Sequence, residues 1–173
     1  GHSRHLDAFL DLIDPDAHIL ELGCGGGRDT TRIIERVFDV DATDGTPAMA
    51  AEATKHLGIP VRVMRFDEIA AVAQYDAVWA HACLLHAPWE DLPGILSAIK
   101  RALKSNGWHF ANYKLGGGEG RDLLGRLGNF PTHDQLEAIY KDAGFTVIKS
   151  EIYRGAGADG TVRDWCSLTV RAR

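Results

Sequence analysis

Residues 19–27 read Ile19-Leu20-Glu21-Leu22-Gly23-Cys24-Gly25-Gly26-Gly27, an apolar run that ends in an acid and then breaks into glycines. The next residues, 28–34, have the composition of a helix. A strand that turns this sharply into a helix points backbone N–H groups at whatever lies above the turn. Glycine also lets a ligand approach the main chain closely. The stretch therefore predicts a strand, a loop that binds a nucleotide-like ligand, and a helix.

A second strand–helix unit follows the first. The stretch 38–44 reads as a strand that ends in Asp44, and an acid at the tip of this strand can accept hydrogen bonds from ribose hydroxyls. Thr46 and Pro47 then predict a new helix, because Thr is a good N-cap and Pro is favoured at the first helical position. Further strands are expected at 61–67, 75–81 and 108–113, and further helices at 6–13, 46–57, 92–103 and 132–144.

These segments resemble the motifs of class I S-adenosylmethionine-dependent methyltransferases. Residues 21–27 fit the family's E-x-G-x-G-x-G, residues 44–49 are similar to D-x-S-P-x-M, and residues 75–78 are similar to F-D-x-V. Residues 101–107 resemble R-x-L-K-P-G-G, with Ser and Asn in place of Pro and the first Gly. The resemblance covers residues 18–113 and continues more loosely to the end of the chain. Small-molecule methyltransferases, including tellurite-resistance-like proteins, are the relatives that it suggests.

The resemblance implies an α/β fold with three layers. Its Rossmann-like sheet would have seven strands in the order 3-2-1-4-5-7-6, with strand 7 antiparallel. The sequence agrees at its end, where strands at 147–153 and 164–170 flank a Gly-rich turn and must be antiparallel if they pair. We expect a single methyltransferase domain over residues 1–173, from which an N-terminal lid segment is missing.

The resemblance also implies S-adenosylmethionine as the cofactor. Glu21 would lie near the methionine amino group, Asp44 at the ribose, and Asp67 at the adenine amino group. Arg28 begins a helix, where a cation opposes the helix dipole, so an anionic ligand group such as the methionine carboxylate would explain it. Phe66 would either stack on adenine or pack in the sheet. The predicted cofactor-binding residues are Glu21, Gly23, Gly25, Gly27, Arg28, Asp44, Gly45, Phe66, Asp67 and His81.

The acceptor is expected to meet the cofactor beyond the fourth and fifth strands. His86 is a candidate general base if the acceptor must lose a proton, although a lone histidine such as His81 or His86 can also be structural. Tyr113 and Lys114 are the other catalytic candidates, because they end the fifth strand at the rim where open α/β sheets bind ligands. The glycine-rich loop that follows, with Glu119, Arg121 and Arg126, is either a mobile lid over the acceptor or a solvated loop.

Composition limits the other classes of function. The chain has 173 residues, a formal net charge of −5 and no long run of Lys or Arg, so a nucleic-acid partner is not indicated. The three cysteines lack metal-ligand spacing and are odd in number, which favours a reducing compartment and predicts no metal site. No stretch looks like a signal peptide or a membrane span, so we expect a cytoplasmic protein. A small-molecule acceptor is what the resemblance implies.

Two other classes of function remain open from the sequence. A nicotinamide-dependent oxidoreductase could use a similar sheet, but Arg28 stands where the third glycine of G-x-G-x-x-G is expected. The antiparallel last strand also counts against it. A non-catalytic domain that only binds the cofactor would show the same motifs.

Overall fold

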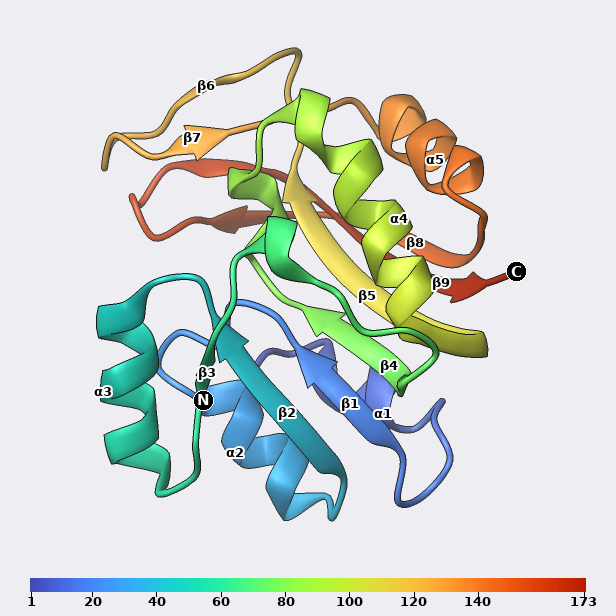
Figure 1. The fold of residues 1–173 in the computed structure, drawn as a ribbon. Helices are drawn as coiled ribbons and strands as arrows, with labels where there is room; N and C mark the ends of the chain where they lie inside the picture. The colour runs from blue at the N-terminus through green and yellow to red at the C-terminus, as the bar shows by residue number, and fades with distance from the viewer.

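The computed structural model describes residues 1–173 and has an α/β architecture, with helices on both faces of one large sheet (Figure 1). The strands are β1 (His18–Glu21), β2 (Asp39–Asp44), β3 (Arg62–Val63), β4 (Tyr75–Ala80), β5 (Leu103–Lys114), β6 (Gly120–Arg121), β7 (Leu127–Gly128), β8 (Phe145–Ala156) and β9 (Val162–Ala172). The helices are α1 (Leu6–Leu10), α2 (Arg28–Glu35), α3 (Pro47–Leu57), α4 (Leu92–Ala102) and α5 (His133–Asp142). None of these helices is both long and apolar enough to cross a membrane.

The large sheet has seven strands in the order β3-β2-β1-β4-β5-β9-β8. Strands β1 to β5 pair in parallel, and β9 runs antiparallel to both β5 and β8. The expected order, 3-2-1-4-5-7-6, is not matched in this numbering. The reason is a short hairpin, β6–β7, which we did not expect and which forms a separate two-stranded sheet inside the glycine-rich loop.

The third strand is much shorter than predicted. We expected a strand over 61–67, but only Arg62 and Val63 pair with β2, and both are exposed at the edge of the sheet. Residues 66–68 instead form a 3₁₀ turn, η1 (Phe66–Glu68). Because this edge strand buries little apolar surface, little stabilises its extended conformation. The chain therefore turns soon after its pairing with β2 ends.

Local sequence signals account for one limit each of helices α2, α3 and α5. Gly27 stands in the left-handed conformation (φ 84°) before α2, and Gly58 does the same (φ 71°) after α3. Helix α5 begins with a capping box, in which Thr132 Oγ1 accepts the N–H of Gln135 at 3.2 Å and the Gln135 amide accepts the N–H of Thr132 at 2.9 Å. These features confirm the predicted helix limits at these points.

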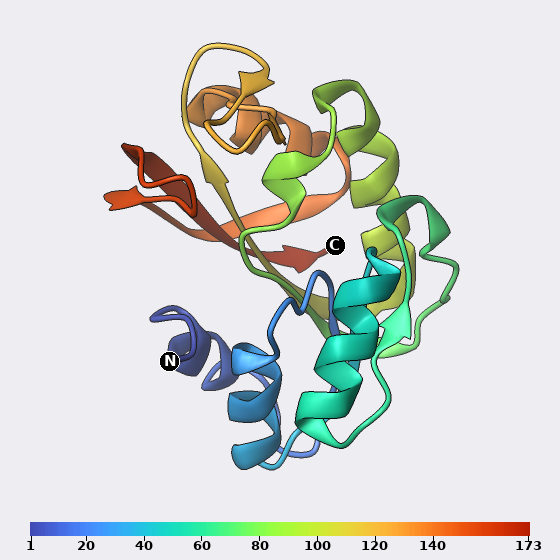
Figure 2. The ribbon, with the colours of Figure 1, turned by 90° about the vertical axis from the view of Figure 1, so that its left-hand side faces the viewer.

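The two largest apolar cores lie on opposite faces of the sheet. The larger core joins the sheet to α4 and α5, and the smaller one joins it to α1 and α2 (Figure 2). In the smaller core the rings of Trp79 and Phe110 stack with centroids 4.3 Å apart, and Phe9 of α1 packs against both. Three free cysteines, Cys24, Cys83 and Cys166, are buried.

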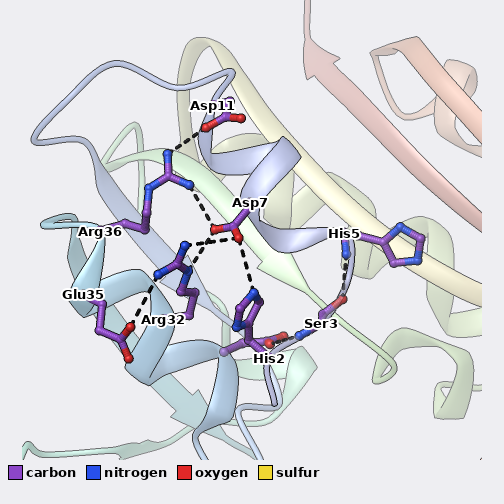
Figure 3. Close-up of polar contacts among 9 residues, drawn as sticks. His2, Ser3, His5, Asp7, Asp11, Arg32, Glu35 and Arg36 are labelled. Carbon is purple, nitrogen blue, oxygen red and sulfur yellow. Dashed lines mark hydrogen bonds and ion pairs between the residues drawn. The ribbon is translucent and has the colours of Figure 1, made fainter.

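A charge cluster fastens α1 to α2 (Figure 3). Asp7 accepts hydrogen bonds from Arg32 at 2.9 Å and from Arg36 at 3.0 Å, and Arg36 also donates to Asp11 at 2.7 Å. Isolated surface ion pairs contribute little, but shared partners in a network hold one geometry better. The N-terminal helix is therefore held beside the helix that follows the glycine loop.

Candidate functional site

The glycine loop between β1 and α2 depends on left-handed backbone. Gly23 and Gly25 have φ of 61° and 54°. A Cβ on Gly23 would stand 2.7 Å from the Cβ of Cys83, so the loop is closed on that side. A Cβ on Gly25 or Gly26 would meet no atom within 4 Å. The loop therefore presents bare backbone to open space, as a loop that receives a ligand must.

Asp44 ends β2 directly beside this loop. Its carboxylate accepts the N–H of Gly25 at 3.0 Å and the N–H of Thr46 at 2.9 Å, and the residue is only 8% exposed. Each carboxylate oxygen can accept a further hydrogen bond, so the group retains capacity for a ligand hydroxyl. Gly45 follows and lies against the backbone of residues 64–65. The structure thus brings Asp44 and Gly45 to the glycine loop.

Glu21 lies at the end of β1 and is 2% exposed. Thr30 of α2 donates a hydrogen bond to its carboxyl group, and Thr43 donates to its backbone carbonyl at 2.7 Å. Burial raises the pKa of Glu21 to about 8; the bond from Thr30 opposes this rise, and the charges of Asp29 and Asp44 add to it. Glu21 therefore joins β1 to α2 at the loop, and its contact with a cofactor amino group stays a prediction.

Arg28 and His81 flank the glycine loop on different elements. Arg28 is exposed at the first position of α2. His81 follows β4, stacks on the indole of Trp79 with centroids 6.0 Å apart, and has Nδ1 3.8 Å from Asp29 Oδ2. Burial lowers the pKa of His81, and the charge of Asp29 opposes this. Asp29 was not predicted as a site residue, because an acid in the first turn of a helix is ordinary.

Phe66, Asp67 and His86 line one cavity of about 740 Å³, which reaches to α4. Asp67 is exposed there and pairs with Arg65 at 3.1 Å. His86 places Nδ1 2.7 Å from the carbonyl of Leu127, and burial lowers its pKa. The three predicted residues are thus brought together, while the glycine loop contributes none of the lining of this cavity.

Tyr113 and Lys114 were predicted to lie at an open rim of the sheet, but in the structure they do not. Strand β5 continues to Lys114 and is covered by its pairing with β9. Tyr113 is 0% exposed, with its hydroxyl 2.8 Å from that of Tyr140, which in turn lies 3.0 Å from Nε2 of His109. Lys114 is 2% exposed, with Nζ 5.4 Å from the ring centroid of Trp165. Neither side chain reaches open space, so their surroundings give no support to a catalytic role for either residue.

The glycine-rich segment 115–131 is fastened to the turns that follow β4. The backbone N–H of Asn129 donates to Leu85 O at 2.9 Å, and its side-chain amide donates to two more carbonyls of the same turn, Leu84 and Ala87, at 3.0 Å each. Glu119 accepts the backbone N–H of Trp89. The segment therefore packs on the residues around His86.

Two glycines of this segment make room for the side chain of Phe130. Phe130 is buried with a φ of 38°, and the guanidinium of Arg163 lies 4.1 Å from its ring centroid. A Cβ on Gly116 would stand 2.9 Å from that of Phe130, and one on Gly128 would collide with the ring itself. The prediction of a lid from glycine content thus missed a packing role.

The two arginines of this segment bond within the segment. Arg121 donates to the carbonyl of Gly125 at 3.1 Å, and Arg126 pairs with Asp122 at 2.8 Å. These contacts stiffen the β6–β7 hairpin. They give no support to a role of Arg121 or Arg126 in a mobile lid over the acceptor. No cluster of His, Cys, Asp and Glu side chains in the structure could hold a metal ion.

Known structures share this fold. A methyltransferase from Methanosarcina mazei, described as S-adenosylmethionine-dependent, superposes with a TM-score of 0.85 at 14% identity, over 95% of this chain and 96% of that one. The 1,6-didemethyltoxoflavin-N1-methyltransferase of Burkholderia thailandensis gives 0.77 at 24% identity, over 98% and 77%. TehB from Haemophilus influenzae gives 0.78 at 16% identity, over 99% and 63%.

The sequence comparisons give one family. No curated protein matches the chain. Residues 19–107 match the sequence model of a family described as a methyltransferase domain, and this region includes the glycine loop, Asp44 and His81. The family model matches most of the parallel sheet, and the fold agrees with it. The chain therefore belongs to the methyltransferase-domain family.

Proposed function

We propose that this protein transfers a methyl group from S-adenosylmethionine to a small-molecule acceptor. The observation that carries the proposal is the contact between Asp44 and the glycine loop: the carboxylate bonds the N–H of Gly25, beside backbone that faces open space. A ribose bound there would find a carboxylate with spare acceptor capacity. The family match supports the same chemistry and does not favour a nicotinamide-dependent oxidoreductase.

The proposed cofactor site extends from the loop in two directions. Glu21, Arg28 and His81 hold the methionine end, with Gly23, Gly25 and Gly27 beneath it. Asp44 and Gly45 hold the ribose. Phe66 and Asp67, which line the 740 Å³ cavity, hold the adenine end. This assignment rests on the resemblance and on the placement of these residues around the carboxyl ends of β1, β2 and β4.

The proposed reaction is an in-line displacement. The cofactor supplies an electrophilic methyl group on a positively charged sulfur. The residues of the chain bind it, orient the acceptor and exclude water, and such positioning can contribute roughly 7–11 kcal/mol in favourable cases. Where the acceptor must lose a proton, His86 is the proposed base: a bond from Nδ1–H to the carbonyl of Leu127 leaves Nε2 free to accept.

The acceptor class is proposed from the neighbours in structure. One is a methyltransferase of 1,6-didemethyltoxoflavin, and another, from Haemonchus contortus, was solved with phosphomonomethylethanolamine and S-adenosylhomocysteine. Both act on small molecules, and the net charge of this chain gives no reason to prefer a nucleic acid. We also propose that the chain acts as one domain in the cytoplasm, in keeping with its three free cysteines.

The test has two stages. Calorimetry with S-adenosylmethionine, and separately with NAD, should show binding of the first alone. Release of S-adenosylhomocysteine should then be measured with a panel that includes 1,6-didemethyltoxoflavin, phosphoethanolamine, sarcosine and tellurite. Binding of NAD in place of S-adenosylmethionine would favour an oxidoreductase. Binding without turnover on any acceptor would indicate a non-catalytic cofactor-binding domain.

A further inference from the structure

Asp29 is a buried carboxylate whose partners come from different segments of the chain. Its Oδ1 accepts the backbone N–H of Ser3 at 2.7 Å, and its Oδ2 accepts the indole N–H of Trp79 at 2.9 Å. His81 Nδ1 lies 3.8 Å from the same Oδ2. A buried carboxylate needs such partners, and bonds to a charged acceptor are stronger than neutral ones. Asp29 therefore fixes three segments relative to one another.

The position of Asp29 links these contacts to the glycine loop. It is the second residue of α2, directly after Gly27 and Arg28. On the other side, the loop is joined to β4 by the N–H of Leu22, which donates to the carbonyl of Trp79 at 2.9 Å. Asp29 and the loop are thus tied to the same residue of β4, and a displacement of Asp29 would move the first turn of α2.

The imidazole of His81 is held on one side and free on the other. Its ring lies parallel to the indole of Trp79, with an interplanar angle of 11°. Asp29 on α2 lies beside the ring, and His5 in the N-terminal segment is the other titratable group that interacts with it electrostatically. The side chain is 34% exposed, and Nε2 has no hydrogen-bond partner in the chain. His81 is therefore oriented and still accessible to a bound molecule.

We propose that Asp29 is a positioning residue of the methyl-transfer site. It holds His81 and the N-terminal segment against the first turn of the helix that follows the glycine loop. This inference rests on the proposed function, because it assumes that the loop receives the cofactor. Asp29 itself touches neither the cofactor nor the acceptor; its effect reaches them through His81 and the loop.

The test compares Asp29→Asn with Asp7→Asn. Both acids join the N-terminal segment to α2, but only Asp29 also contacts Trp79 and His81 (Figure 3 shows Asp7). The probe is S-adenosylhomocysteine, measured by calorimetry, together with an NMR titration of the His81 imidazole. Asp29→Asn should weaken binding about tenfold, the scale of a lost charge-assisted bond. It should also lower the pKa of His81, because a neighbouring anion is removed. Asp7→Asn should change neither the affinity for S-adenosylhomocysteine nor the acid dissociation constant of His81 by more than about twofold.

A second pair separates the contact from the charge. Ser3→Pro removes the backbone N–H that donates to Asp29 and leaves the carboxylates of Asp29 and Asp7 in place. Ser3→Ala keeps that N–H. Ser3→Pro should weaken S-adenosylhomocysteine binding about threefold relative to Ser3→Ala. If the role of Asp29 is only structural, Asp29→Asn should lower the melting temperature, while the pKa of His81 and the affinity should match those of Asp7→Asn. This result would overturn the inference. If the wild-type protein fails to bind S-adenosylhomocysteine, the proposed function falls and the inference falls with it.

Discussion

The glycine loop and the segment 115–131 both contain many glycines, but they use them in opposite ways. In the loop, Gly25 and Gly26 face open space and leave backbone uncovered. In the segment, the space beside Gly116 and Gly128 is taken by the side chain of Phe130. The same residue type thus exposes the main chain in one region and admits a side chain in the other. Glycine content alone does not distinguish a binding loop from a packed one.

Gly23→Ala should have the largest effect on stability. Gly23 has a φ of 61°, and the new Cβ would stand 2.7 Å from that of Cys83. Left-handed backbone and overpacking together should cost roughly 3 kcal/mol of the free energy of unfolding. The control is Gly26→Ala, where the space is open and the expected loss is under about 0.5 kcal/mol. Urea unfolding of both variants checks this, and equal losses would remove the distinction between closed and open sides of the loop.

Glu21→Gln should flatten the dependence of stability on pH. The folded chain keeps the Glu21 proton up to a pKa of about 8, while the unfolded chain releases it near 4.5, so wild-type stability falls as pH rises between these values. Between pH 5 and 7 the unfolding free energy of the wild type should fall by about 2–3 kcal/mol relative to that of the variant. The measurement is the difference in unfolding free energy between the two proteins across this range. A constant difference would show that the carboxyl group is not buried as described.

Asp44→Ala should lower cofactor affinity by about 2 kcal/mol, the scale of charge-assisted hydrogen bonds. The control is Asp39→Ala, on the same strand but exposed at its far end. Calorimetry with S-adenosylmethionine gives both affinities. An unchanged affinity in Asp44→Ala would refute the ribose assignment, on which the site map depends.

Tyr113→Phe should have the smallest effect, on stability alone. The variant loses the bond to the Tyr140 hydroxyl, which keeps its contact with His109, so the expected loss is about 1 kcal/mol. Affinity for S-adenosylmethionine and methyl transfer should match the wild type, since the side chain is buried. A lower turnover in a stable Tyr113→Phe protein would restore the catalytic role that the structure does not support.

The sequence was most informative where a short stretch determines its own geometry. The glycine loop, the acid that ends β2 and the helix starts at Thr46 and Thr132 depend on a few neighbouring residues, and their positions in the fold were predictable. Tyr113 and Lys114 were misplaced because their surroundings come from β9, which lies about fifty residues later in the chain. Asp29 was also missed, because an acid in the first turn of a helix is ordinary and its partners Ser3 and Trp79 are distant in sequence.

The packing around Phe130 ties several positions of the chain to one another. While the ring is present, Gly128 cannot take a larger residue, and Arg163 has an aromatic face to cover. If the ring were trimmed to a small side chain, these positions would become free to vary. Substitutions here should therefore be permissible in only one historical order, with Phe130 changing before Gly128.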